Sequence, residues 1–258
     1  MNLIFDKAQT GTYKSSSQVA RVVTESWLAE NMYCPICGAN LLHQYTPNKP
    51  VADFFCRLCL ADFELKSYQS DRTELKKKIP DGAYNSMIER ITSLRNPHLF
   101  VMTYANMKVN NLILIPNFFF VPEVIEQRPP LKDTARRAGW IGCNIEIGSI
   151  PAVGKIVLVK GGKERSKTEV VEEYQELLSL QMSSIKKRGW LFDIIQCIER
   201  IKVKDFSLED IYVFSDELKK KHPENNFVKD KIRQQLQVLR DKGFIEFRSR
   251  GKYRKLLI

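Results

Sequence analysis

Two Cys-x2-Cys pairs, separated by eighteen residues, limit the folds open to this chain more than any other feature. The pairs are Cys34 with Cys37 and Cys56 with Cys59. At this spacing a tight turn aims both sulfurs of a pair at one ion, so two turns supply the four thiolates of a tetrahedral Zn²⁺ site. Two structural disulfides are the alternative, but they require an oxidising compartment that nothing in the sequence indicates. We therefore predict a closed, structural zinc site, with any catalysis carried out elsewhere.

Charge is distributed unevenly along the 258 residues. Residues 182–258 hold 19 Lys and Arg against 11 Asp and Glu, whereas residues 1–181 hold 22 against 19. This asymmetry predicts a polyanionic partner, although a solvated lysine-rich surface would give the same counts. No run approaches the ~18 apolar residues of a membrane span, and no secretory signal is found at the N-terminus. We therefore expect a cytoplasmic, bacterial protein without a membrane partner.

Hydrophobic periodicity predicts mixed α and β structure before a domain boundary near residue 183. The boundary is placed where the apolar pattern stops, which gives domains over 1–183 and 184–258. Polar stretches with prolines at 69–82 and 126–139 are interpreted as loops. The expected helices are 17–32, 83–95 and 168–183, and the expected strands are 63–66, 99–104, 112–115 and 155–160.

The second domain follows the order of a winged helix-turn-helix. Helices are expected at 190–201, 207–221 and 227–242, with Ser207 and Asp210 forming a capping box, and a basic hairpin follows. The third helix would enter the major groove and the hairpin would contact phosphates. A winged helix that binds protein instead of DNA is the alternative. The residues expected at the DNA are Lys229, Lys231, Arg233, Gln234, Gln237, Arg248, Arg250, Lys252 and Arg254.

Two acids and a lysine lie close to the second cysteine pair. Asp53 is followed, after ten residues, by Glu64-Leu65-Lys66. Glu64 and Lys66 are two apart on an expected strand and share a face, which Asp53 can reach from a neighbouring strand. Two carboxylates can hold Mg²⁺, and a lysine beside the metal can orient or deprotonate an attacking water, as in phosphodiester hydrolysis. An ordinary salt-bridged hairpin is the alternative, because such spacings are frequent in charged chains.

The segment PVADFFCRLCLADFELK resembles the active site of PD-(D/E)xK nucleases, with Pro50 displaced from its usual place beside the acid. More specifically, the chain resembles the DpnI-like methyl-directed restriction endonucleases, and the matching stretches extend over essentially the whole chain. They are YCPICG (33–38), PVADFFC (50–56), FELKS (63–67), TARRAGWIGCNI (134–145), IRQQLQVLRDKGFIEF (232–247) and RGKYRKL (250–256).

This resemblance implies an α/β fold: a PD-(D/E)xK-type mixed sheet with an inserted four-cysteine zinc site, followed by the winged helix domain. It implies a type II enzyme that cleaves double-stranded DNA with Mg²⁺ at GATC sites containing N6-methyladenine. The roles it carries over are Mg²⁺ ligation for Asp53 and Glu64, catalysis for Lys66, and zinc ligation for the four cysteines. A non-enzymatic DNA-binding regulator is the alternative, but it would not need the acids and the lysine.

A methyl group alone discriminates weakly. The N6-methyl lies exposed in the major groove, and burying the two methyls of a palindrome is worth roughly 1.6 kcal/mol, barely beyond tenfold. Two domains that each test the site would add discrimination. In the first domain we expect Arg136, Arg137 and Trp140 to contact DNA, since an aromatic face can meet an N-methyl group. The alternative places Trp140 in the core and the arginines in a solvated loop.

The sequence predicts one active site per chain. We expect a monomer, so cutting both strands requires either sequential nicking or a transient dimer on DNA.

Overall fold

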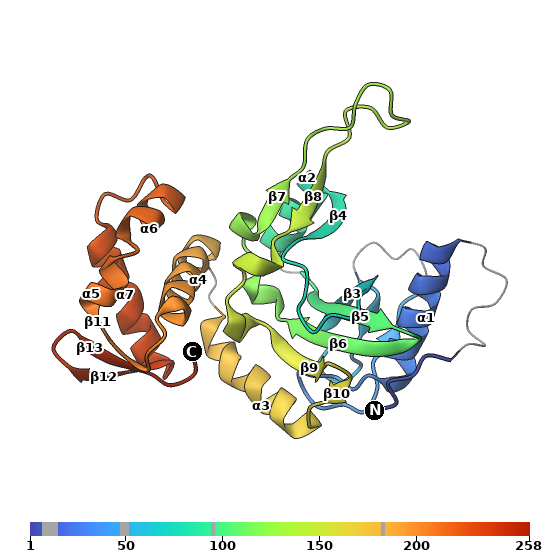
Figure 1. Cartoon of the computed structure of the whole chain (residues 1–258), viewed down its shortest axis with the longest axis horizontal. Coiled ribbons are helices and arrows are strands. Elements are labelled where there is room, and N and C mark those ends of the chain that lie inside the picture. The colour runs from blue at the N-terminus through green and yellow to red at the C-terminus, as the bar shows by residue number, and fades with distance from the viewer. Residues whose placement is uncertain (7–14, 47–51, 94–95, 182–183) are drawn as a thin grey trace.

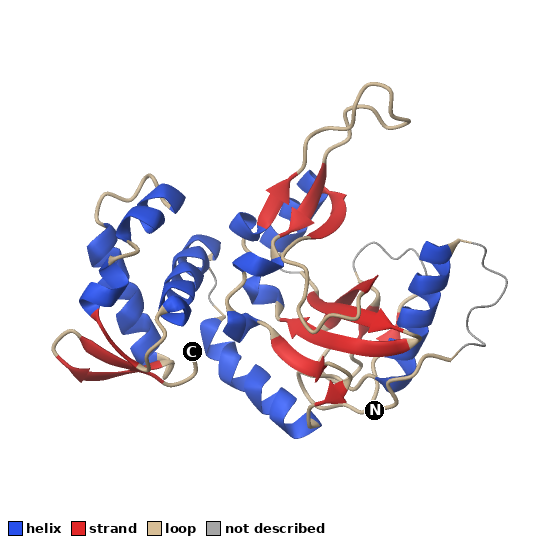
Figure 2. Ribbon diagram, viewed as in Figure 1, coloured by secondary structure: helices blue, strands red, loops and turns tan. Residues whose placement is uncertain are grey.

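In the computed structural model, a mixed α/β body is followed by a smaller, mainly helical part (Figures 1 and 2). The structure describes residues 1–6, 15–46, 52–93, 96–181 and 184–258. The expectations for Pro50, for residues 94–95 and for residues 182–183 lie outside these ranges. Across the described residues, no helix is both long enough and apolar enough to cross a membrane.

A seven-stranded sheet with the order β1-β2-β3-β5-β6-β9-β10 forms the centre of the larger body. β3 and β5 are parallel, and the other neighbours are antiparallel, so the sheet is mixed. Helix α1 (Ser16–Asn31) packs against β3, and α3 (Lys167–Leu177) packs against β9. The strands are β1 (His43–Gln44), β2 (Phe54–Phe55), β3 (Asp62–Gln69), β5 (His98–Ala105), β6 (Lys108–Ile115), β9 (Ile156–Lys160) and β10 (Lys163–Glu164).

A second antiparallel sheet has the order β4-β8-β7 and carries a projecting arm. Its strands are β4 (Ile79–Ala83), β7 (Ile125–Gln127) and β8 (Gly142–Ile145), and α2 (Tyr84–Thr92) follows β4 directly. Residues 128–141 connect β7 to β8 as a long loop that extends away from the body (Figure 1). We call this loop the arm.

Strand β4 corrects the expectation of a loop over 69–82, and β7 shortens the loop expected at 126–139. Pro80 lacks an N–H and is tolerated because β4 lies at the edge of its sheet among the described strands, paired with β8 on one side, with a bulge between Asp81 and Ala83. Because residues 80–82 are of types that favour turns, the sequence did not indicate that they form part of a strand.

The other expected elements are present with different ends. β6 begins at Lys108 instead of residue 112, after a turn in which Asn106 and Met107 have positive φ. α3 ends at Leu177 and continues only as a 3-10 turn, so the helix expected to reach 183 is too long. The 3-10 turns are η2 (Asn117–Phe119), η3 (Pro122–Val124), η4 (Ile147–Ser149), η5 (Ala152–Gly154) and η6 (Leu178–Leu180).

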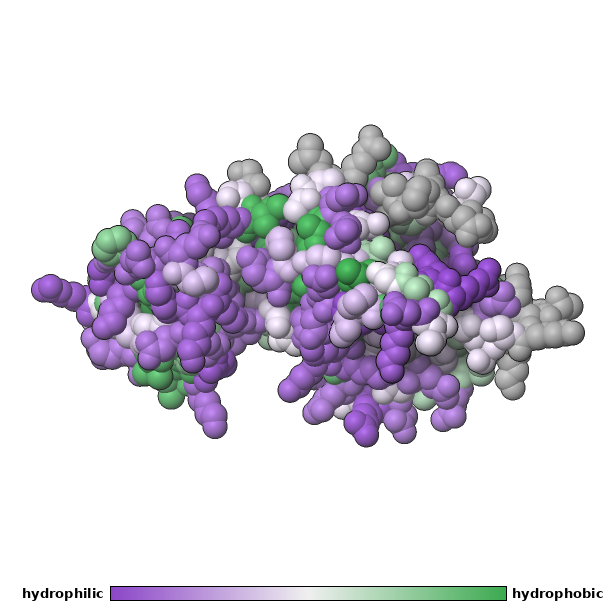
Figure 3. All heavy atoms as spheres, turned by 90° about the horizontal axis from the view of Figure 1, so that it is seen from above, coloured by the Kyte–Doolittle hydropathy of each residue, from purple (hydrophilic) through white to green (hydrophobic). Residues whose placement is uncertain are grey.

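The C-terminal part has the winged helix arrangement, with a sheet of order β11-β13-β12. The Ser207–Asp210 capping box is present, but the helix expected over 207–221 is broken into α5 and α6. Seen from above, this part is covered mainly by hydrophilic side chains (Figure 3). Its elements are α4 (Ile185–Arg200), β11 (Asp205–Ser207), α5 (Leu208–Tyr212), α6 (Ser215–Lys221), α7 (Val228–Asp241), β12 (Ile245–Ser249) and β13 (Lys252–Lys255).

Helix α4 contributes to the cores of both parts. It begins at Ile185, five residues before the expected start. The buried ring of Phe192 stacks on Phe119 with centroids 4.6 Å apart, and Arg188 Nη1 donates to the carbonyl of Phe118 at 2.9 Å. Helix α4 also packs against α7 of the C-terminal part, and it carries further buried residues such as Ile195. The two parts are therefore joined through a packed, apolar contact.

Candidate active site

The four cysteines of the two pairs converge. Their sulfurs lie within 4.8 Å of one another, and Cys34 Sγ is 3.6 Å from Cys59 Sγ, as Cys37 Sγ is from Cys56 Sγ. A tetrahedron with Zn–S bonds of about 2.3 Å has sulfurs about 3.8 Å apart, so the arrangement fits Zn²⁺. The separations are far longer than a disulfide of about 2.05 Å. The structure thus brings together all four predicted zinc ligands.

Each cysteine pair lies in its own turn, and the two turns have the same hydrogen-bond pattern. Gly38 N donates to the carbonyl of Cys34 at 2.9 Å, and Leu60 N donates to the carbonyl of Cys56 at 3.0 Å. Gly38 has φ of +75° and Leu60 has φ of +60°, which is the left-handed conformation that closes the turn. Leu60 accepts a strained conformation that glycine adopts freely. The two turns present their sulfurs in matching geometry.

Burial makes two of these thiols, those of Cys34 and Cys59, hard to ionise without a cation. It raises the pKa of Cys34 above its usual range and the pKa of Cys59 to about 11. For Cys56, burial acts upward too, but hydrogen bonds from the backbone at Cys59 and Leu58 outweigh it and lower the pKa. A metal ion supplies the missing positive charge and deprotonates thiols that bind it. The donor set therefore suits a resident Zn²⁺.

The second cysteine turn joins the strands that position Asp53 and Glu64. Asp53 lies immediately before β2, its N–H donates to the carbonyl of Phe63 at 3.0 Å, and its Oδ2 accepts from Leu65 N at 2.8 Å. Because Cys56 follows β2 and Cys59 precedes β3, a metal bound there closes this hairpin. The predicted placement of Asp53 beside Glu64 is what the structure shows.

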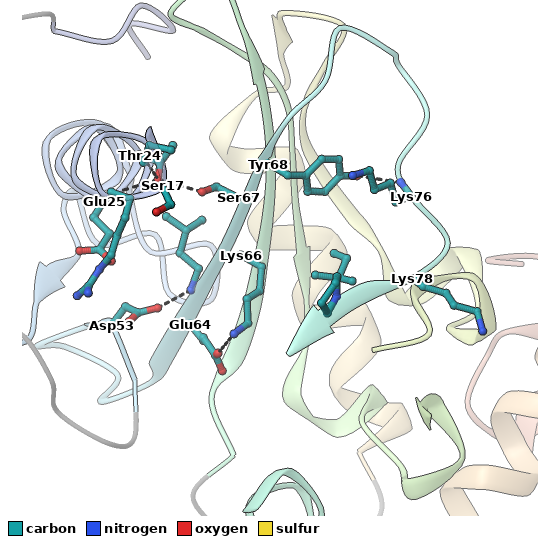
Figure 4. A pocket seen from close by; sticks show the side chains of 15 residues that line it. Ser17, Thr24, Glu25, Asp53, Glu64, Lys66, Ser67, Tyr68, Lys76 and Lys78 are labelled. Carbon is teal, nitrogen blue, oxygen red and sulfur yellow. Dashed lines mark hydrogen bonds and ion pairs between the residues drawn. The ribbon is translucent and has the colours of Figure 1, made fainter. Parts of the chain in front are cut away.

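Asp53, Glu64 and Lys66 line one cavity of about 520 Å³ (Figure 4). The cavity lies between α1, β3 and the segment leading into β4, and Lys76 and Lys78 lie on its β4 side. It combines oxygen ligands suited to a divalent cation with ammonium groups suited to a phosphate. Its other charged lining residues are Arg21 and Glu25.

Lys66 is held between two carboxylates. Its Nζ lies 2.7 Å from Glu64 Oε1 and 2.5 Å from Asp81 Oδ1. Arg90 of α2 completes the cluster, with Nη2 2.8 Å from Glu64 Oε2 and 3.8 Å from Asp81 Oδ2. Asp81 and Arg90 were missed in the sequence. Asp81 stands between a proline and a glycine, and Arg90 is a typical basic residue in the last turn of a helix.

The pKa values of the residues that line the cavity depend on their burial and on the charges beside them. Burial raises the pKa of Asp53, the N–H of Leu65 opposes this, and the nearby charges of Glu64 and Glu25 raise it further. Burial acts to lower the pKa of Lys66, but Glu64 and Asp81 outweigh it and the pKa is raised. Lys66 is therefore a cation here, while the acids gather negative charge that a metal would neutralise.

Glu25 is a further acid that the sequence did not single out. It lies on α1 and accepts from Arg21 Nε at 2.7 Å and from Gln44 Nε2 at 3.0 Å. In the sequence it is indistinguishable from an ordinary surface ion pair four residues apart on a helix. Only the packing of α1 on β3 turns it toward Asp53.

Trp140 and the two arginines expected beside it lie on the arm, outside the core. Arg136 and Arg137 are exposed and Trp140 is half-buried. The guanidinium of Arg137 lies 4.9 Å from the centre of the Trp140 ring, and that of Arg128, which was not predicted, lies 5.7 Å away. The alternative of a core tryptophan is wrong, whereas a solvated arm and a DNA-contacting arm both remain consistent with this geometry.

The basic residues of the winged helix lie at the surface to different degrees. On α7, Lys229, Arg233, Gln234 and Gln237 are exposed, and Lys231 is half-buried. On the hairpin, Arg248, Arg250 and Lys252 are exposed.

Three of the arginines expected at the DNA, Arg233, Arg248 and Arg254, form ion pairs within the protein. Arg254 donates to both carboxylate oxygens of Asp205, at 2.7 and 2.9 Å, which ties β13 to β11. Arg233 pairs with Asp230 and also donates to the hydroxyl of Tyr212 at 2.8 Å. Arg254 is therefore held in the sheet, unlike Arg250 at the exposed tip of the hairpin.

A mixed sheet with a four-cysteine cluster and a cavity of acids and a lysine, followed by a winged helix, is an arrangement that suits a nuclease that binds DNA. Two family models match the chain and agree with this class. The model of the DpnI Dam-replacing family matches residues 1–183, and that of the Dam-replacing HTH domain, DpnI_C, matches residues 186–255. The chain belongs to the DpnI Dam-replacing family, which is a family of restriction endonucleases, and its partner is double-stranded DNA.

Proposed function

We propose that this protein is a Mg²⁺-dependent type II restriction endonuclease that cleaves double-stranded DNA at GATC sites containing N6-methyladenine. The observation that carries the proposal is the convergence of Asp53, Glu64 and Lys66 in one cavity of a chain from a restriction endonuclease family. A regulator that only binds DNA has no use for such a cluster, because gathering partly buried charges is costly without a task.

Asp53 and Glu64 would hold the Mg²⁺. Their oxygens are hard ligands of the kind this ion prefers, and a cation beside them would oppose the burial and the neighbouring acids that raise the pKa of Asp53. When bound, Mg²⁺ supplies positive charge that stabilises the negative charge developing on the phosphate oxygens. The site suits a few protein carboxylates plus water, as Mg²⁺ sites usually do.

The chain's own residues position the substrate. Lys66 keeps its proton on Nζ and directs it into the cavity beside Glu64, where it can orient the attacking water or balance charge on the phosphate. Lys76 attracts the DNA backbone toward the same cavity, whereas the ammonium of Lys78 is already paired with Glu126 and Glu146. The zinc site holds the β2–β3 hairpin and with it the spacing between Asp53 and Glu64.

Sequence and methylation would be read in two domains, which we propose extend over residues 1–183 and 184–258. In the first, the arm presents Trp140 together with Arg128 and Arg137, a combination suited to an N-methyl group and the adjacent phosphates. In the second, α7 enters the major groove and the hairpin contacts the backbone. Recognition of one site by two domains would compensate for the small free energy gained by burying a single methyl group.

Each chain offers one such cavity within the part that the structure describes. A monomer would therefore cut the two strands in succession, and a concerted double-strand cut would need two copies meeting on the DNA. A time course on supercoiled plasmid separates these routes, because successive cutting accumulates nicked circles.

The decisive experiment uses one plasmid prepared with and without adenine methylation, incubated with the protein and Mg²⁺. We expect cutting of the methylated copy alone, with no cutting of either copy in EDTA. Cutting of both copies would keep the nuclease and remove the methyl requirement. Cutting of neither, by protein that binds the methylated copy, would favour a regulator.

A further inference from the structure

Both carboxylate oxygens of Glu64 are already occupied by cations. Lys66 Nζ lies 2.7 Å from one oxygen, and Arg90 Nη2 lies 2.8 Å from the other. The same oxygens are the ones that would face Mg²⁺. Lys66 and Arg90 would therefore compete with a metal for Glu64. Both would lose the negative charge that neutralises them when Glu64 binds the metal. A second acid is needed if Lys66 is to stay in place.

Asp81 contacts the same two cations. Its Oδ1 lies 2.5 Å from Lys66 Nζ and also accepts from Gly82 N at 2.8 Å, which fixes the carboxylate. Its Oδ2 is 3.8 Å from Arg90 Nη2, is buried, and has no hydrogen-bond partner among the described residues. Asp81 thus has unused acceptor capacity on the side that faces Arg90.

The backbone of Asp81 is held by elements outside the β2–β3 hairpin, which carries the candidate Mg²⁺ ligands. Asp81 lies on β4 and pairs with Cys143 of β8, in the second sheet. Arg128 at the base of the arm donates to the carbonyl of Asp81 at 3.4 Å. The backbone that carries this carboxylate is therefore held by elements outside the β2–β3 hairpin.

We infer that Asp81 is a positioning residue for Lys66. It holds the ammonium at the cavity and takes over Arg90 when Glu64 turns to Mg²⁺, so that metal binding does not displace the lysine. The inference rests on the proposed nuclease function, and it assigns to Asp81 neither metal ligation nor contact with DNA.

The test compares Asp81→Asn, Asp81→Glu and wild-type protein, with Asp71→Asn as the matched control. Asp71 is an exposed acid of the segment between β3 and β4, so the same chemical change there leaves the cluster intact. Four quantities are measured: kcat and KM on methylated DNA, DNA affinity in EDTA, Mg²⁺ affinity of the DNA-free protein by calorimetry, and melting temperature.

Asp81→Asn is expected to lower kcat by about 10- to 100-fold, the size of effect typical of a misplaced catalytic group. DNA affinity in EDTA and KM should stay within about twofold. Mg²⁺ should bind several-fold more weakly, because Lys66 and Arg90 then both depend on Glu64. Asp81→Glu should restore most of the loss in both kcat and Mg²⁺ affinity, and Asp71→Asn should match wild type.

An unchanged kcat in Asp81→Asn would overturn the inference, as would equal losses in Asp81→Asn and Asp81→Glu together with lowered melting temperatures. If Asp81→Asn does not fold, Asp81→Glu decides: near-normal kcat and Mg²⁺ affinity support the role, and their loss in a folded protein overturns it. A wild-type protein that never cuts would contradict the proposed function, while the effect of Asp81 on Mg²⁺ affinity would still be measured.

Discussion

The cysteine cluster and the cluster of acids around Lys66 lie at two ends of one hairpin, yet they are built differently. The cysteine cluster uses four like ligands from two copies of one turn, and it is closed. The acid cluster joins unlike charges from the β2–β3 hairpin, β4 and α2, and it opens onto a cavity of about 520 Å³. The contrast indicates that stability is concentrated in the first cluster and chemistry in the second, so each should fail in its own way.

The largest effect is expected from removing the zinc site. Cys34→Ser, or a strong chelator, should unfold the first part of the chain, because structural zinc contributes about 10–16 kcal/mol in zinc-finger peptides, as much as a domain's whole stability. Melting temperature and bound zinc report the loss. Cys143→Ser, which changes a buried thiol outside the cluster, should keep its zinc. A melting curve unchanged by chelation would contradict a structural metal.

The acid cluster should show the opposite pattern. Glu64→Ala is expected to lower cleavage by about 10³-fold or more, since metal-ion stabilisation supplies several kcal/mol, while folding and DNA binding in EDTA are kept. Cleavage assays, binding titrations and melting curves on the same preparation separate these properties. A large fall in melting temperature without selective loss of cleavage would return Glu64 to the role of an ordinary ion pair in a hairpin.

The smallest effects are expected from substitutions that test whether the two cysteine turns have equivalent backbone conformations. Gly38→Ala should destabilise the zinc-loaded protein by about 1–2 kcal/mol, because φ of +75° is unfavourable for a residue with a Cβ. Leu60→Gly should stabilise it by up to about 1 kcal/mol, since Leu60 has the same strain and is 78% exposed. Urea unfolding measures both. Changes of the same sign would show that the two turns are not equivalent.

The same contrast explains what could be predicted from the sequence. Each cysteine pair is local, so its spacing encodes its geometry, and Glu64 with Lys66 is encoded by the alternation of a strand. The contributions of Asp81, Arg90 and Glu25 depend on how β4, α2 and α1 pack around β3. Those contacts are set by tertiary structure, and the edge position of β4 lets Pro80-Asp81-Gly82 look like a turn.

The winged helix was predicted well for a similar reason. Its capping box at Ser207 and the stop at Gly243 are short-range signals, and both are confirmed. The pairing of Arg254 with Asp205 was missed, because β11 is a three-residue strand without a distinct pattern. Basic residues in a hairpin thus indicate the charge of a surface, but not which side chains are already engaged.

The stacking of Phe192 on Phe119 has a practical consequence for anyone dissecting this molecule. A fragment that begins at residue 184 would carry α4 without the rings that cover it, leaving Phe192 in water and Arg188 without the carbonyl of Phe118. Exposed apolar surface of this kind promotes self-association. Poor solubility of an isolated C-terminal fragment would then reflect where the chain was cut, and tests of its DNA preference are better made with the intact protein.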